Sequence, residues 1–153
     1  MKRIISAALL LGLPVAVAEA KTSWGVSKTP FLEAGSSEPE SDADLRAICF
    51  GGLVTIRIGG SIGVGKGDGE PVSVKIEGEG KSATLHGVSM NTPDSEMTGG
   101  TELVTDLHLD SPAAEILFSG KAVKIVTPDH KTHTLFDADP AGAVKKFVKQ
   151  CKG

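Results

Sequence analysis

Short segments in which apolar and polar residues alternate run through most of the chain, and they constrain its fold more than any other feature. Val72, Val74 and Ile76 alternate with polar neighbours over residues 72–77. A period of two places the apolar side chains on one face of an extended strand. Further segments of this kind are 23–27, 45–50, 53–58, 82–88, 103–109, 122–127 and 132–136. The pattern predicts a mainly β protein, either an antiparallel β-sandwich or a barrel-like domain.

The C-terminal segment departs from this pattern and predicts an α-helix. At 100° per residue one arc is apolar and the opposite arc carries lysines. The apolar arc holds Ala143, Val144, Phe147, Val148 and Cys151, and the lysines are Lys145, Lys146, Lys149 and Lys152. Asp139 is the predicted N-cap, and Pro140 suits the first helical turn. We expect one terminal helix that packs on the β core, with Cys151 facing the sheet.

The first twenty residues have the organisation of a secretory signal peptide. Lys2 and Arg3 precede an apolar stretch over residues 4–17, and Ala18-Glu19-Ala20 matches a cleavage site. The apolar stretch is too short to span a membrane. We therefore expect cleavage after Ala20, no stable membrane anchor afterwards, and a single β-rich domain over residues 21–153 in the periplasm or the medium.

The charge of the expected mature chain excludes one class of partner. The whole chain has a formal net charge of −3 at pH 7, and loss of Lys2, Arg3 and Glu19 with the signal peptide makes it more negative. Because nothing supplies a strongly basic surface, nucleic acid is not an expected partner. The expected partner is another envelope protein or a host protein.

An acidic segment interrupts the strands at residues 33–44. It carries five acidic residues, no basic ones, and a filler rich in Ser, Gly and Pro. Such composition predicts a solvated, flexible loop. An acidic docking site is the alternative.

The chain has two cysteines, Cys49 and Cys151, and the expected compartment indicates their redox state. In an oxidising compartment an even count predicts disulfides, and two cysteines allow a single pairing. Cys49 ends segment 45–50, on the same face as Leu45 and Ala47. A pair of buried free thiols is the alternative.

Residues 59–71, GGSIGVGKGDGEP, contain the outlines of two functional motifs. Gly60 to Lys66 matches most of a phosphate-binding loop, but Gly67 stands where Ser or Thr would hold Mg²⁺, and no helix follows. Ser61 lies in the G-x-S-x-G outline of a hydrolase, but poor helix formers follow it. We interpret the segment as a flexible hairpin connection between strands 53–58 and 72–77, with Ser61 and Lys66 in a mobile binding loop as the alternative.

Histidines offer a weak metal-binding candidate and no catalytic residue. His130 and His133 flank a predicted turn next to Asp129, and two imidazoles with a carboxylate could contact Zn²⁺. No third strong ligand is evident, so a solvated hairpin tip is the favoured interpretation. His86 and His108 fall on the polar faces of their strands. We expect no cofactor.

Scattered positions across the chain form a series that resembles a known group. They are Trp24, the segment 45–49 that ends in Cys49, the segment 114–121, Phe136-Asp137, and a final helix with Ala143, Phe147 and Cys151. The series resembles the VasI-like small periplasmic proteins associated with type VI secretion and the related invasion-associated locus B proteins. The resemblance implies a β-sandwich-like domain with a C-terminal helix and a Cys–Cys bridge, and no catalytic residues.

A second resemblance concerns periplasmic lysozyme inhibitors, small exported β proteins whose S-G-x-x-Y loop enters the lysozyme cleft. Ser119 and Gly120 match the first two positions, followed by Lys121 and Ala122, and Val123 stands at the tyrosine position. An acidic domain could also attract cationic lysozyme. Ser119, Gly120 and Lys121 are therefore candidate binding residues.

The sequence favours an exported, non-enzymatic binding or envelope accessory protein. A lysozyme inhibitor is the first alternative, and an uncharacterised hydrolase or metal-binding protein is the second. Convergence of Ser61 with a histidine and a carboxylate would favour the hydrolase. A protruding loop at 119–122 would favour the inhibitor.

Overall fold

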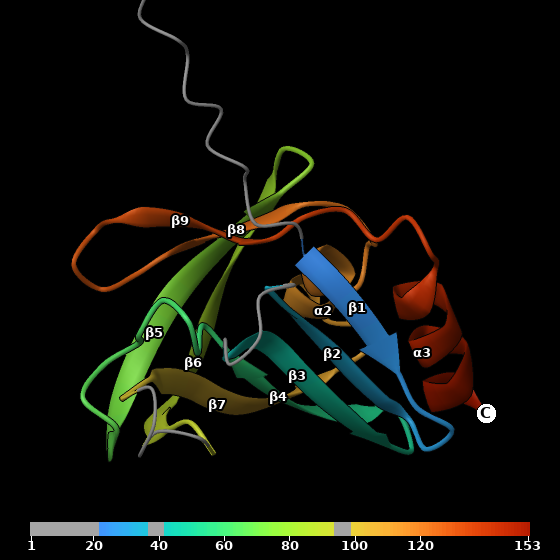
Figure 1. Ribbon diagram of the computed structural model, residues 1–153, viewed down its shortest axis with the longest axis horizontal. Coiled ribbons are helices and arrows are strands. Elements are labelled where there is room, and N and C mark those ends of the chain that lie inside the picture. Colours follow the sequence, from blue (N-terminus) through green and yellow to red (C-terminus); the bar gives the residue numbers. More distant parts are fainter. Residues whose placement is uncertain (1–21, 37–41, 94–98) are drawn as a thin grey trace, which may run out of the picture.

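Within residues 22–36, 42–93 and 99–153, which the computed structural model describes, nine strands form one antiparallel sheet. The sheet curls into a nearly closed barrel (Figure 1). The strands are β1 (Thr22–Val26), β2 (Phe31–Ser36), β3 (Ala43–Phe50), β4 (Leu53–Ile58), β5 (Asp68–Gly78), β6 (Lys81–Asn91), β7 (Thr101–His108), β8 (Val123–Val126) and β9 (Thr132–Phe136). The prediction of a mainly β, barrel-like domain is confirmed.

The strand order is β1-β2-β3-β4-β7-β6-β5-β8-β9. Strands β1 to β4 form one meander, and β5 to β7 form a second meander that joins the first through β7 beside β4. The two outer strands meet at the seam. The Trp24 ring contacts the Phe136 ring edge-on at 5.0 Å, and the Asp137 N–H donates to Thr22 Oγ1 at 3.0 Å.

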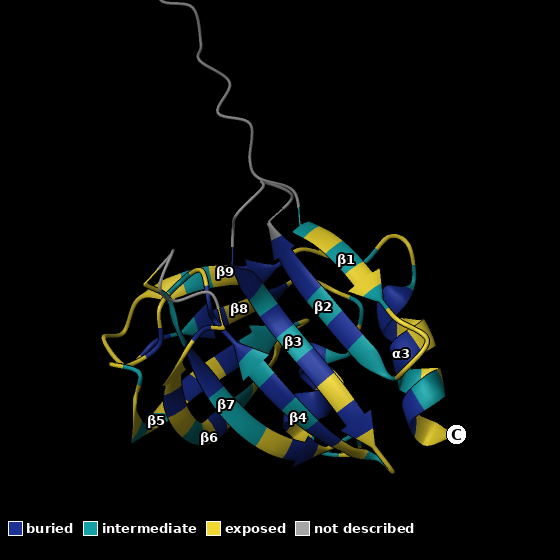
Figure 2. Ribbon diagram, turned by 60° about the horizontal axis from the view of Figure 1, so that its bottom comes forward, coloured by how far each residue is buried: buried dark blue, intermediate teal, exposed yellow. Residues whose placement is uncertain are grey.

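The alternating residues give the barrel its core. Along β3, inward residues Leu45, Ala47 and Cys49 lie opposite Ile58, Ile56 and Val54 of β4, and all six are buried. Figure 2 shows the resulting alternation of buried and more exposed positions along β2 and β3. Burial of each large aliphatic side chain contributes about 1.5–3 kcal/mol relative to exposure. The apolar positions of the period-two pattern are therefore the ones that form the core.

The terminal helix α3 (Ala143–Lys152) packs as its apolar arc predicts. It buries Ala143, Val144, Phe147 and Cys151, and the Phe147 ring lies 5.4 Å from that of Phe118. A disulfide joins Cys151 to Cys49, with Cα atoms 5.6 Å apart. The predicted pairing is confirmed, and it fixes the end of the helix to the end of β3.

The predicted start of this helix is wrong by three residues. Gly142, with φ of 74°, is the N-cap, and Ala143 is the first helical residue. The Asp139 carboxylate nevertheless accepts the N–H groups of Gly142 (3.0 Å) and Val144 (2.8 Å). Asp139 thus satisfies N–H groups at the helix start, but from a turn that precedes the helix.

Two elements were not predicted as such, β2 and the short helix α2 (Pro112–Leu117). The expected acidic loop over 33–44 is shorter than predicted, because residues 33–36 belong to β2 and residues 43–44 belong to β3. Residues 37–41 of this loop lie outside the described residues. Leu32 and Ala34 are fully buried, and Arg46 Nε donates to Glu33 at 3.1 Å. In α2, Ser111 Oγ accepts the Ala114 N–H at 3.3 Å, and Pro112 occupies the first turn.

The predicted hairpin between 53–58 and 72–77 is wrong. The neighbours of β4 are β3 and β7, and those of β5 are β6 and β8, so residues 59–67 cross one end of the barrel. Val64 is fully buried there, and its N–H donates to Thr101 O at 2.9 Å. A Cβ on Gly60 would lie 2.7 Å from Ala43 O, so this close approach requires glycine.

Two expectations about the N-terminus lie outside the described residues: the signal peptide, 1–20, and its cleavage after Ala20. Across the part of the chain that is described, no helix is both long and apolar enough to cross a membrane.

Candidate functional site

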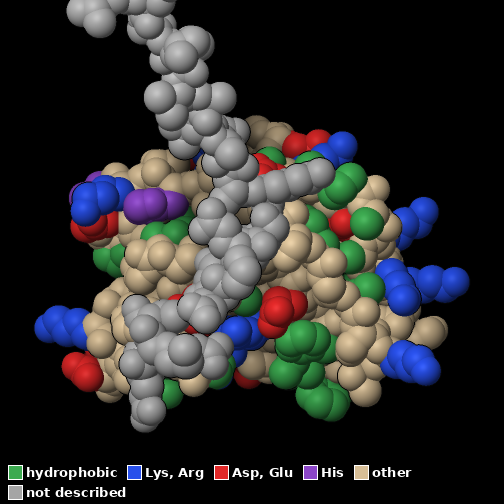
Figure 3. Space-filling model, in the orientation of Figure 1, with side chains coloured by type: hydrophobic (Ala, Val, Ile, Leu, Met, Phe, Trp, Pro, Cys, Tyr) green, Lys and Arg blue, Asp and Glu red, His purple; other side chains and the backbone are tan. Residues whose placement is uncertain are grey.

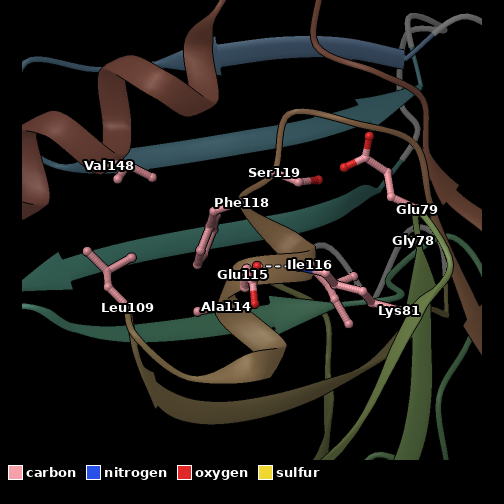
Figure 4. Close-up of a pocket in the computed structure, with 10 residues that line it drawn as sticks. All are labelled: Gly78, Glu79, Lys81, Leu109, Ala114, Glu115, Ile116, Phe118, Ser119 and Val148. Carbon is pink, nitrogen blue, oxygen red and sulfur yellow. Dashed lines mark hydrogen bonds and ion pairs between the residues drawn. The ribbon is translucent and has the colours of Figure 1, made fainter.

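A hollow of about 330 Å³ lies beside α2, between the β5–β6 turn and α3. Figure 4 shows Leu109, Phe118 and Val148 on one side of it and Glu79 and Lys81 on the other. The first three side chains supply an apolar floor. Lys81 pairs with Glu115 of α2 at the rim. The hollow therefore combines apolar surface with charge at its edge, as ligand-binding hollows do.

Two further hollows share walls with this one. A hollow of about 580 Å³ shares the Glu79–Lys81 turn and extends to Lys124 and Asp137. Another of about 450 Å³ shares Phe118, Ser119 and Val148 and extends to residues 139–145. We call the three together the α2 groove. Its rim carries both signs of charge, so a partner with mixed charges would find complementary groups.

The predicted binding residues Ser119, Gly120 and Lys121 lie together in this groove. Gly120 adopts φ of 75°, and its carbonyl accepts the Asp139 N–H at 3.0 Å. Ser119 Oγ accepts the Lys121 N–H at 3.2 Å. Lys121 Nζ lies 4.0 Å from the Glu79 carboxylate. The loop is exposed, and the hydrogen bond from Asp139 N–H joins it to the turn that precedes α3.

Ser61 and Lys66 lie on the other candidate loop, which crosses the opposite end of the barrel. Ser61 Oγ donates to the Asp44 carboxylate. Burial raises the pKa of Asp44, and the hydrogen bond from Ser61 opposes this shift. No histidine among the described residues hydrogen-bonds to Ser61. Lys66 is exposed. The Ser61–Asp44 pair therefore stabilises the loop.

In the weak metal-binding candidate formed by Asp129, His130 and His133, Asp129 forms an ion pair with Lys131. Asp129 accepts hydrogen bonds from Thr127 Oγ1 at 2.5 Å and from Lys131 Nζ at 2.7 Å. The bond from Lys131 is the main reason that the pKa of Asp129 is well below its usual range. His130 occupies the turn with φ of 64°. In the described ranges no three or more His, Cys, Asp or Glu side chains are grouped so as to hold a metal ion.

The other two histidines lie on exposed strand positions, as expected. His86 Nδ1 is 2.7 Å from Ser73 Oγ on the neighbouring strand, and His108 is exposed at the end of β7. Neither lines the α2 groove.

A partly buried ion pair at the outer face of the barrel was not predicted from the sequence. Glu102 of β7 is fully buried, and Arg57 Nε of β4 donates to it. Burial raises the pKa of Glu102, whereas Arg57 lowers it. Glu102 sits beside the apolar Leu103, and nothing in the local pattern marks it as buried. Glu102 and Arg57 come together only through the pairing of β4 with β7, which the sequence did not predict.

No family model, no curated protein and no solved structure matches this chain. The candidate functional site is the α2 groove, where three adjoining hollows and three predicted binding residues meet.

Proposed function

We propose that the protein is an exported, non-enzymatic binding or envelope accessory protein of the periplasm, and that the α2 groove receives a segment of a protein partner. The observation that carries the proposal is the apolar floor of Leu109, Phe118 and Val148 beneath a rim with both signs of charge. The signal-peptide organisation of residues 1–20 supports export. The resemblance to VasI-like proteins supports an accessory role.

A peptide segment suits this groove for two physical reasons. Each hollow is large enough for one or a few side chains, and apolar side chains that leave water on binding supply most of the affinity. The rim residues Glu79, Lys81 and Lys121 are largely exposed, so they contribute selectivity and association rate more than affinity.

The test is crosslinking in the native periplasm with a photoreactive residue placed at Ala122. Ala122 is exposed and lines the groove. The matched control places the same residue at Lys66, which is exposed at the opposite end of the barrel. We expect a discrete crosslinked protein from position 122 that position 66 does not capture. A Phe118→Asp change should abolish it.

Added lysozyme separates the runner-up function from the proposed one. If Ala122 crosslinks to lysozyme and the protein lowers lysozyme activity, the groove belongs to an inhibitor. Equal crosslinking from both positions, or none from position 122, would contradict a binding groove.

A further inference from the structure

A second surface lies at the end of the barrel where β3 turns into β4. Phe50 is 77% exposed, Ile48 is 43% exposed and Leu53 is 39% exposed. These three side chains share the outer face, because their neighbours Cys49 and Val54 face the core. Phe50 and Leu53 are Cα partners on either side of the turn. Large apolar side chains that remain exposed side by side mark a site of interaction.

Lysines lie on one side of this apolar tip because the disulfide brings α3 to it. Cys49, next to Phe50, is bonded to Cys151, next to Lys152. Lys149 lies one turn earlier on the exposed face of the helix. Figures 1 and 2 both show the β3–β4 turn near the C-terminus. Figure 3 shows hydrophobic side chains at the lower edge of the molecule and Lys or Arg side chains along the neighbouring edge.

A third lysine comes from the β1–β2 turn. The Cys49 N–H donates to Pro30 O at 2.9 Å, and Gln150 Nε2 donates to Ser27 O at 3.3 Å, so this turn is held between β3 and α3. It carries exposed Lys28. None of Lys28, Lys149 and Lys152 forms an ion pair with a described residue. We call Lys28, Ile48, Phe50, Leu53, Lys149 and Lys152 together the Phe50 corner.

The charge at this corner differs from that of the molecule as a whole. Four acidic groups lie near the corner. Glu33 of β2 pairs with Arg46, and Asp106 of β7 accepts a hydrogen bond from Thr55 Oγ1. The other two are Asp110, next to Leu109 whose N–H donates to Gly52 O, and the terminal carboxylate of Gly153. The helix itself carries only basic charges, because Lys145 and Lys146 extend its exposed face. Asp42 and Asp44 lie at the opposite end of β3. The side of the apolar tip formed by α3 and the β1–β2 turn is therefore basic, although the protein as a whole is acidic.

We propose that the Phe50 corner docks reversibly on an anionic phospholipid surface. Phe50, Ile48 and Leu53 would enter the boundary between headgroups and acyl chains, where apolar side chains leave water. The lysines would remain among the phosphates and bury their methylene stems alongside the tip. A fluid bilayer can close around a hairpin tip, whereas a protein would need a matching socket. The corner shares no residue with the α2 groove, so this activity goes beyond the proposed function.

Vesicle cosedimentation tests this docking with the chain purified from the periplasm and verified by mass to begin at Lys21. One set of vesicles contains phosphatidylglycerol and phosphatidylcholine in equal parts, and the other contains phosphatidylcholine alone. We expect binding to the anionic vesicles that weakens as salt increases. Phe50→Ser should weaken it at least about tenfold. The double change Lys149→Gln/Lys152→Gln should weaken it by about fivefold for each lysine.

The matched control is Lys66→Gln/Lys131→Gln, which removes the same charge from exposed lysines outside both the corner and the α2 groove. It should bind within about twofold of the parent, since distant charges are screened. Thermal melting confirms that each variant is folded. Failure of the parent to bind anionic vesicles would overturn the proposal, as would unchanged binding by Phe50→Ser or equal losses in the two double variants. Capture of a protein by the Phe50 corner without vesicle binding would also overturn it. None of these results bears on crosslinking from Ala122.

Discussion

Reduction of the Cys49–Cys151 disulfide should remove a large part of the stability of the fold. The two cysteines are 102 residues apart, and a crosslink that closes a loop of this size restricts the unfolded chain by about 4.7 kcal/mol in the chain-entropy description. A typical domain is stable by only about 5–15 kcal/mol. For a domain of this size 1 kcal/mol shifts the melting temperature by roughly 3–4 °C, so the reduced protein should melt about 15 °C lower.

The assay is thermal unfolding with and without reductant, together with Cys151→Ala. Both cysteines are buried, at 4% and 6% exposure, so the variant should melt close to the reduced parent. The double variant Cys49→Ala/Cys151→Ala should not respond to reductant. A reduced parent that melts within about 3 °C of the oxidised one would refute the reasoning. Free thiols that titrate in the natively exported protein would refute the bridge itself.

Two further predictions concern the loop at the opposite end of the barrel. In urea unfolding, Ser61→Ala should destabilise the protein by about 1–2 kcal/mol, because it leaves the partly buried Asp44 carboxylate without its hydroxyl donor. Lys66→Ala should change the stability by less than about 0.5 kcal/mol. Equal effects of the two substitutions would contradict this role of Ser61. Because burial raises the pKa of Asp44, its carboxyl favours folding below its unfolded pKa and this advantage is lost as the pH rises through its folded pKa. Asp44→Asn should therefore gain stability relative to the parent as the pH rises from the unfolded pKa of Asp44 through its folded pKa, and a difference that is constant with pH would exclude burial as the cause.

Much of the α2 groove could not be predicted from the sequence, because contacts between residues far apart in the chain form it. The sequence singled out Ser119, Gly120 and Lys121, and the structure places them in the α2 groove. The floor of that groove combines Leu109 from the turn before α2, Phe118 at the C-terminal end of α2, and Val148 from α3. Nothing in the sequence near any one of them indicates that the others lie beside it.

The exposed Phe50 illustrates the same limit within a single strand. In β3 both faces carry apolar residues, because Ile48 and Phe50 alternate with Ala47 and Cys49. Period-two alternation assigns side chains to two faces, but it does not say which apolar face meets the core. The disulfide to α3 and the pairing with β4 decided that Cys49 points inward.

The sequence by itself determined the class of the fold, the face of the terminal helix and the cysteine pairing. Each of these depends on residues that repeat within a few positions, or on a count that allows one answer. Tertiary structure decided the position of β7 beside β4, the course of residues 59–67 across the barrel end, and the burial of Glu102. These depend on which distant faces bury the most apolar surface together, and that free energy is summed over the whole barrel rather than over any one segment.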